Sequence, residues 1–282
     1  MTNIYNRGEL FEQLKDIFVE NIIDLEKAQI DNYYEYWLRN FNELKSNKLK
    51  VSDNLIHKNQ MIQKKSVLKG VDLPTWFGDF NNKRIVILGI DPLRNHKVFK
   101  EAEADVKNDV ILGTPYAFHE KSARDKDCKS YWTLVEGLKN ANNFVYCTDI
   151  FKTYYYNEID KIRSYRDPDY TKNLNHLKIL KQELELVQPD IIIVFGQLAH
   201  TFLLNKKCPK ISQSILDTKS IYSTANKSAE VYTVLHLSKT PRGNNFKIFL
   251  ENNGINTKAI NVEDRVQCAE KYLDIFKRNN II

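Results

Sequence analysis

Four near-continuous apolar stretches are the feature that most limits how this chain can fold. They are short, rich in β-branched residues and separated by helical patterns at 131–141 and 171–188, with a further helical pattern at 262–278. The stretches are RIVILG at 84–89, FVYCTD at 144–149, DIIIVFG at 190–196 and VYTVLHLS at 231–238. Continuous apolar strands that alternate with helices predict a three-layer α/β/α domain around a mostly parallel central sheet.

The N-terminal part has a different character. Between Gly8 and Ser46 apolar residues recur at helical spacing, and seven lysines then lie within residues 42–70. Such a charge-rich segment is typical of a solvated surface connection. We therefore expect residues 1–70 to form an N-terminal helical extension and a basic linker, and residues 71–282 to form the α/β domain.

Charge and hydropathy favour a polyanionic partner and disfavour a membrane. The chain has 42 Lys and Arg against 36 Asp and Glu, a formal net charge of +6. No apolar run reaches the length that spans a bilayer, and the first residues lack the order of an export signal. We expect a soluble, cytoplasmic protein that acts as a monomer.

The spacing of cysteine, histidine and glycine predicts neither a metal site nor a cofactor. Four cysteines and six histidines are scattered along the chain, without a C-x-x-C or H-E-x-x-H pattern. The glycine-rich motifs that bind phosphate or dinucleotides are absent as well. A nucleotide-binding fold therefore has no support in the sequence.

Polar residues stand where the predicted strands end. Asp91, Asp149 and His236 each follow a buried strand, and ligands of parallel sheets bind beyond the carboxyl ends of the strands. Each residue also has a structural explanation, because Asp91 precedes a proline as helix caps do and Asp149 can cap a turn. A buried histidine in the core explains His236 equally well.

The order of these motifs resembles that of the uracil-DNA glycosylase superfamily over roughly residues 71–250. VILGIDPLRN is similar to the family motif in which a strand ends in Gly-x-Asp-Pro-Tyr-His, and GTPYAFH to the segment that supplies an aromatic ring. YCTDIFK resembles the strand end that carries a base-reading asparagine, and VQPDIIIVFGQLAHTFLL a central strand and helix of the iron–sulfur branch. VLHLSKTPRGN resembles the second catalytic motif, His-Pro-Ser. The four cysteines do not fit the iron–sulfur spacing, so no cluster is carried over.

The resemblance implies a role for each matching residue. Asp91 would activate or position water, His236 would donate to the departing base, and Phe118 would stack on the flipped base. A core aromatic is the simplest alternative for Phe118. In SKTPRGN, Ser238, Lys239 and Arg242 would contact DNA beside the displaced base, with a tight surface turn as the alternative.

Asp149 stands where the family pattern has asparagine. A carboxylate accepts from the N4 amino group of cytosine, and a protonated carboxyl would also donate to N3, whereas uracil needs one donor and one acceptor. Leu93 replaces the tyrosine that excludes 5-substituted bases, and Arg94 and Asn95 follow it. Leu93, Arg94 and Asn95 would therefore leave room for a polar group on C5, unless they form an ordinary polar loop.

These residues together predict a DNA glycosylase that releases a cytosine-type, 5-modified base. Hydroxymethylated or glucosylated cytosine of phage DNA would be such a target, which suggests antiviral defence. The alternatives are a uracil-DNA glycosylase of base-excision repair and a catalytically silent reader of DNA bases. Tyr154, Tyr155 and Tyr156 suit base stacking and a half-buried strand equally well.

Overall fold

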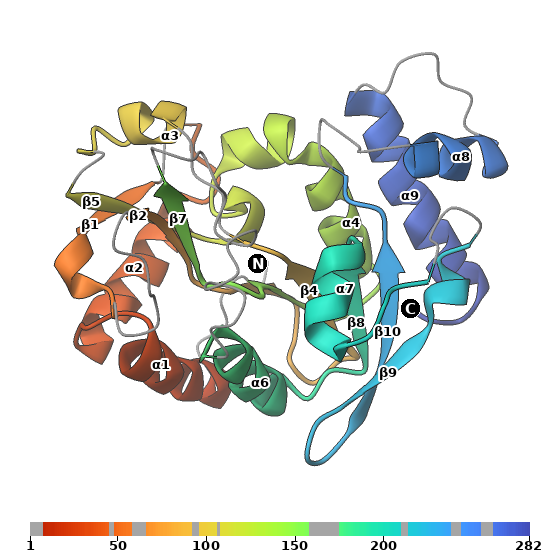
Figure 1. Ribbon diagram of the computed structural model, residues 1–282, viewed down its shortest axis with the longest axis horizontal. Coiled ribbons are helices and arrows are strands. Elements are labelled where there is room, and N and C mark those ends of the chain that lie inside the picture. The colour runs from red at the N-terminus through yellow and green to blue at the C-terminus, as the bar shows by residue number, and fades with distance from the viewer. Residues whose placement is uncertain are drawn as a thin grey trace.

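A computed structural model gives the architecture of the chain. It describes residues 8–44, 48–57, 66–91, 96–105, 108–157, 175–209, 214–237, 244–254 and 262–282. Figure 1 shows a mixed α/β fold in which helices cover a central sheet. No helix in these ranges is both long and apolar enough to cross a membrane.

The central sheet has six strands in the order β3-β6-β4-β8-β10-β9. Their bounds are β3 Thr75–Phe77, β6 Phe144–Asp149, β4 Arg84–Gly89, β8 Ile191–Phe195, β10 Ser228–Val234 and β9 Ser220–Ser223. The four inner strands run parallel, and β3 and β9 pair antiparallel at the edges. The predicted mostly parallel central sheet is therefore confirmed.

Two helical layers cover the two faces of this sheet (Figure 1). One layer holds α1 Glu9–Asn21, α2 Lys27–Arg39, α6 Asn175–Val187 and α7 Gln197–Leu204, and the other holds α4 Lys129–Asn140, α8 Asn244–Asn252 and α9 Val262–Arg278. Along β4 the side chains alternate, because Val86 and Leu88 pack towards α1 and α6 while Ile85 and Ile87 pack towards α4 and α9. This three-layer arrangement is the one that the alternating pattern predicts.

A second sheet of four strands lies beside the first, in the order β1-β5-β2-β7. Its strands are β1 Leu49–Ser52, β5 Asp109–Gly113, β2 Ser66–Asp72 and β7 Thr153–Asn157, and the short helix α3 spans His96–Glu101. Tyr154 and Tyr155 belong to β7, where Tyr154 is buried and Tyr155 is partly buried against the core.

The segment 42–70 differs from the solvated connection that we expected, because it contains β1 and β2. Val51 and Leu68 are buried in the same core as the N-terminal helices. Lys50, on the opposite side of β1, is exposed and donates to the carbonyl of Glu103. A four-residue strand is too short for its alternation to outweigh a high lysine content. The division of the chain at residue 70 stays a prediction.

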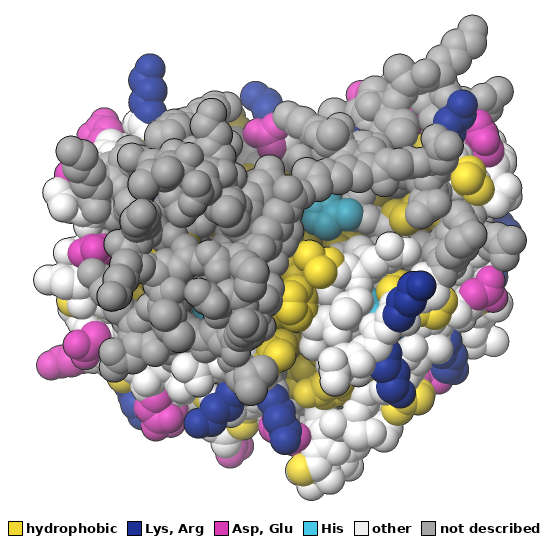
Figure 2. All heavy atoms as spheres, in the orientation of Figure 1, with side chains coloured by type: hydrophobic (Ala, Val, Ile, Leu, Met, Phe, Trp, Pro, Cys, Tyr) yellow, Lys and Arg dark blue, Asp and Glu magenta, His cyan; other side chains and the backbone are white. Residues whose placement is uncertain are grey.

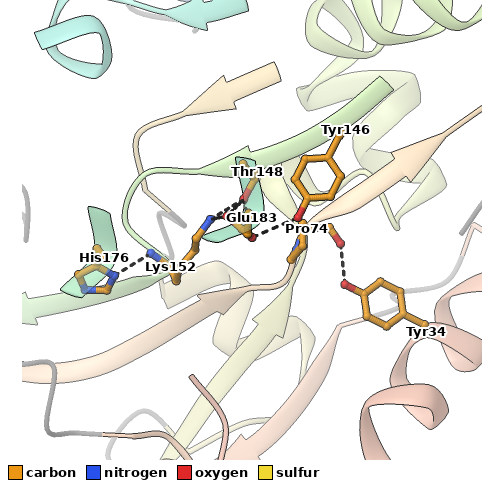
Figure 3. A network of polar contacts seen from close by, with 7 residues as sticks. All are labelled: Tyr34, Pro74, Tyr146, Thr148, Lys152, His176 and Glu183. Carbon is orange, nitrogen blue, oxygen red and sulfur yellow. Dashed lines mark hydrogen bonds and ion pairs between the residues drawn. The ribbon is translucent and has the colours of Figure 1, made fainter. Parts of the chain in front are cut away.

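A buried polar network lies where β6 ends and the chain crosses to β7 (Figure 3). The ammonium of Lys152 pairs with the carboxylate of Glu183 from α6, and both side chains are buried. Tyr146 and Thr148 of β6 donate to the same carboxylate, and the main-chain N–H of Lys152 donates to Nδ1 of His176. These contacts fix the exit of β6 against α6.

Burial sets the protonation of the groups in this network. Burial raises the pKa of Glu183 above its ordinary value, while the ammonium of Lys152 acts in the opposite direction. Burial also lowers the pKa of His176 to about 3, and the charge of Lys152 adds to the effect. His176 is therefore neutral, which suits a ring nitrogen that accepts from a main-chain N–H.

Removing one partner of the buried pair should be costly. We expect Glu183→Gln to lower the free energy of unfolding by about 3–5 kcal/mol, because it leaves the Lys152 charge buried without its counter-ion. Urea unfolding measures this loss, and the double variant Lys152→Met/Glu183→Leu should recover much of it. The exposed pair Lys247–Glu251 is the control, since Glu251→Gln should cost less than about 1 kcal/mol. A Glu183→Gln variant as stable as the parent would contradict the expectation.

Candidate active site

The register of the sheet brings the strand exits into one row. Gly89 of β4 pairs with Asp149 of β6, Leu88 pairs with Val194 of β8, and Val234 of β10 pairs with Phe195. Asp149, Gly89 and Phe195 therefore lie side by side at the carboxyl edge. By the alternation of the strands, all three face the layer that holds α4 and α9.

Gly89 leaves space in this row for the carboxylate of Asp149. A Cβ atom on Gly89 would lie 2.1 Å from Oδ1 of Asp149 and 3.0 Å from the hydroxyl oxygen of Tyr116. The carboxylate thus lies directly over the backbone of β4, and Asp149 is buried. Only glycine permits this arrangement without moving Asp149.

Asp91 lies two residues beyond this row. The contact between β4 and β6 continues past the strand end, where the N–H groups of Ile150 and Phe151 donate to the carbonyls of Gly89 and Ile90. Asp91 is half-buried at this carboxyl edge. The strand β8 separates it laterally from the exit of β10, where His236 lies.

His236 is held by a tyrosine from α4. The hydroxyl of Tyr131 lies 2.6 Å from Nδ1 of His236. Burial lowers the pKa of His236 to about 4 and raises the pKa of Tyr131 well above its ordinary value. The ring is therefore neutral and the phenol protonated. When the O–H donates to Nδ1, the imidazole proton is on Nε2, which is then a donor.

An aromatic cluster connects His236 to the Asp149 side of the row. The rings of Tyr116 and Tyr131 are stacked, with centroids 4.1 Å apart and planes 21° apart. Phe195 packs edge-on against both rings, and His236 lies 6.4 Å from Tyr116 between ring centroids. Tyr116 thus lies between the imidazole and the Asp149 carboxylate.

Tyr116, and not Phe118, comes to the carboxyl edge. The side chain of Phe118 is fully buried and packs against Trp132. The reason is local, because Tyr116 and Ala117 both have left-handed backbone conformations, with φ of 56° and 52°. This double turn directs residue 116 to the edge and residue 118 into the core, which differs from the position that we expected for Phe118.

Two tyrosines of this site were missed by sequence reasoning. Tyr131 falls within a helical pattern, where an aromatic residue predicts only a buried face. Tyr116 is two residues from the aromatic that the motif singled out, and its left-handed conformation has no glycine or asparagine to mark it. A search of GTPYAFH for every aromatic ring would have included Tyr116.

Main-chain contacts hold the segment that follows His236. The carbonyl of Leu237 accepts from Ser130 of α4 and from the buried guanidinium of Arg265 of α9. The next predicted DNA contacts and the residues expected near C5 of the base lie outside the described residues, namely Leu93, Arg94, Asn95, Ser238, Lys239 and Arg242. Their roles stay predictions.

The space-filling view shows one face of the molecule (Figure 2). In Figure 2 a histidine side chain lies at the head of a strip of hydrophobic side chains that runs down the middle of the molecule. Within the described ranges, no three His, Cys, Asp or Glu side chains come together in a way that would hold a metal ion.

The fold and the polar carboxyl edge define an α/β protein with a candidate active site beyond its parallel strands. A sequence model of the Uracil DNA glycosylase superfamily matches residues 75–255, and the chain belongs to this superfamily. Members of the superfamily are DNA glycosylases, hydrolases that act on DNA. No curated protein matches the chain.

The Tyr131–His236 contact predicts a single imidazole tautomer. In nitrogen NMR spectra near neutral pH, the His236 ring should carry its proton on Nε2, and Tyr131→Phe should produce a mixture of the two neutral tautomers. Tyr272→Phe is the control, because that hydroxyl bonds to the carbonyl of Leu235 and not to the imidazole. An unchanged His236 spectrum in Tyr131→Phe would show that the hydroxyl does not select the tautomer.

Proposed function

We propose that the protein is an active DNA glycosylase that hydrolyses the N-glycosidic bond of a pyrimidine swung out of the DNA stack. The observation that carries the proposal is the neutral His236, hydrogen-bonded to Tyr131 at the same carboxyl edge as Asp91 and Asp149. Membership of the superfamily supports the same activity.

The residues suit the two charges that develop in this reaction. As the bond between C1′ and the base nitrogen breaks, its electron pair leaves with the base, and the sugar becomes positive. The Nε2–H of His236 would donate to the base oxygen, and the Asp91 carboxylate would stabilise the sugar. Asp91 would then accept a proton from the water whose oxygen bonds to C1′. The base leaves as an anion that takes up a proton from solvent, so the products are the free base and an abasic site.

Asp149 supports a cytosine-type base as the substrate. Its buried carboxylate faces the site and accepts hydrogen bonds, as the N4 amino group of cytosine requires. A glycosylase that removed plain cytosine would destroy its own genome, so the proposed targets are 5-modified cytosines, such as the hydroxymethylated or glucosylated base of phage DNA. Antiviral defence is the corresponding biological role.

A panel of duplexes tests the proposed substrate. Duplexes that carry uracil, cytosine, 5-hydroxymethylcytosine or glucosylated 5-hydroxymethylcytosine are incubated with the protein, and abasic sites are then measured. We expect release of a 5-modified cytosine. Release of uracil alone would replace this proposal with a uracil-DNA glycosylase, and binding without release of any base would replace it with a base reader.

Substitution of the two proposed catalytic residues should abolish turnover without unfolding the protein. We expect Asp91→Asn and His236→Ala each to lower kcat by about 100-fold to 1,000-fold, because each removes a preorganised group from the transition state. Asp274→Asn on the exposed side of α9 and His57→Ala, whose ring contacts the carbonyl of Val19, are the matched controls. Full activity in either active-site variant would remove that residue from the mechanism.

The lowered pKa of His236 predicts how activity and stability change at acidic pH. The folded protein keeps this imidazole neutral between pH 6.5 and about 4, where an unfolded chain would bind the proton. The donor form should therefore persist down to about pH 4, and the stability that His236 contributes should fall as the pH drops below 6.5. A profile of kcat/KM against pH measures the first effect, and a break near pH 6.5 that His236→Gln abolishes would contradict it.

A further inference from the structure

Tyr116 carries a buried hydroxyl that has no hydrogen-bond partner within the described part of the chain. Among the described residues nothing accepts from or donates to this oxygen, which is inaccessible to solvent. Leaving a buried hydroxyl in this state costs about 1–3 kcal/mol, so such groups in native proteins call for an explanation. A ligand that completes the hydrogen bond is one.

The hydroxyl is aimed at the place where the base-reading carboxylate lies. The oxygen of Tyr116 and Oδ1 of Asp149 both lie within 3.0 Å of the point where a Cβ atom of Gly89 would be. Burial raises the pKa of Tyr116 well above its ordinary value, and the neighbouring Tyr131 and Asp149 add to the effect. The phenol therefore stays protonated and offers a donor beside an acceptor.

The backbone holds the ring in this position. Tyr116 and Ala117 both adopt the left-handed conformation, which costs about 1–2 kcal/mol for each residue that has a Cβ atom. Tyr131 covers one side of the Tyr116 ring, with the two planes inclined by 21°. Strain of this kind collects at functional sites, where the surrounding structure maintains it.

The order of the side chains across the sheet matches one pairing edge. His236 follows β10, Asp149 ends β6, and the hydroxyl of Tyr116 lies over Gly89 of β4, while Phe195 of the intervening β8 packs against the Tyr116 ring. A pyrimidine presents O2, then N3, then the substituent on C4. With O2 at His236, N3 would meet Tyr116 and the C4 substituent would meet Asp149. Cytosine has an acceptor at N3 and an amino donor on C4, so its edge fits a phenol followed by a carboxylate.

We propose that Tyr116 is a specificity-determining residue that donates its hydroxyl hydrogen to N3 of a flipped cytosine-type base, while Asp149 accepts from the N4 amino group. This assignment rests on the proposed function and deepens it, because it explains how Asp149 can read cytosine by accepting a hydrogen bond, without donating a proton. Uracil would place O4 against the carboxylate, and the two acceptors would repel each other.

Tyr116→Phe tests the assignment, because it removes the hydroxyl and keeps the ring. The variant should lose about 10-fold to 100-fold in kcat/KM on the 5-modified cytosine duplex, the range that one hydrogen bond of about 1–3 kcal/mol supplies, and much less on uracil. Its melting temperature without DNA should equal or exceed that of the parent. Tyr146→Phe is the control, since its hydroxyl donates to Glu183, and it should lower the melting temperature without changing base preference.

A second variant should reverse the base preference. Asp149→Asn places an amide donor opposite the C4 substituent, and the Tyr116 oxygen can accept from N3–H, so preference should move towards uracil. Equal losses on both bases in Tyr116→Phe, or no loss at all, would overturn the assignment.

Binding separates this assignment from the proposed function. The Kd values of the parent and Tyr116→Phe are measured by fluorescence anisotropy on mismatched duplexes that carry one 5-hydroxymethylcytosine or one uracil. In one outcome, the parent binds one base preferentially, Tyr116→Phe loses that preference, and the parent releases no base. That outcome would support the roles of Tyr116 and Asp149 in base recognition and contradict the proposed glycosylase activity. Release of a base with a preference that does not depend on Tyr116 would support the glycosylase activity and contradict the role of Tyr116. The absence of any base preference, in binding or in release, would contradict the roles of both Tyr116 and Asp149 in base recognition.

Discussion

The buried ion pair between Lys152 and Glu183 is the interaction on which the rest of the site depends. Lys152 lies where the chain leaves β6 of the central sheet and enters β7 of the second sheet, and its carbonyl accepts from the N–H of Asp72 in β2. The pair therefore ties both sheets to α6. Asp149 lies three residues before Lys152. Because the buried ion pair holds the chain where it passes from β6 to β7, it also helps to fix the position of Asp149.

The candidate site consists of side chains that the fold holds in fixed protonation states. Burial keeps His236 neutral and Tyr131 and Tyr116 protonated, and each effect has the same cause, which is removal from water. The mechanism proposed above needs donors whose hydrogens do not depend on the pH of the surroundings. In this site the aromatic cluster supplies the dry environment as well as the hydroxyl that orients the imidazole.

Much of the fold was predictable because long apolar runs have few alternatives. The strand at 144–149 and the helix at 262–278 have the bounds that their patterns predict. The second sheet was not predictable, since β1 has only four residues, and β1 and most of β2 fall within a lysine-rich segment. Their pairing depends on residues far apart in the chain, which no local pattern records.

Some residues of the candidate site were likewise predictable from the sequence, and others were not. Asp91, Asp149 and His236 were predicted because a strand exit marks a position in space as well as in sequence, and their roles stay predictions. Tyr131 and Tyr116 were missed, because their roles arise from a helix packing against a strand end and from two left-handed residues. Phe118 shows the limit of interpreting a motif by residue type alone. Its ring is buried in the core, whereas the ring of Tyr116, two residues earlier, lies at the carboxyl edge.

Positions 89 and 149 cannot vary independently. The carboxylate of Asp149 fills the volume that any side chain at 89 would need. A larger residue at 89 would therefore push the carboxylate aside, and a shorter residue at 149 would leave a hole against bare backbone. A descendant of this protein that acquires a different base preference is constrained to keep glycine at 89 or to exchange both residues together, so the two positions should covary among its relatives.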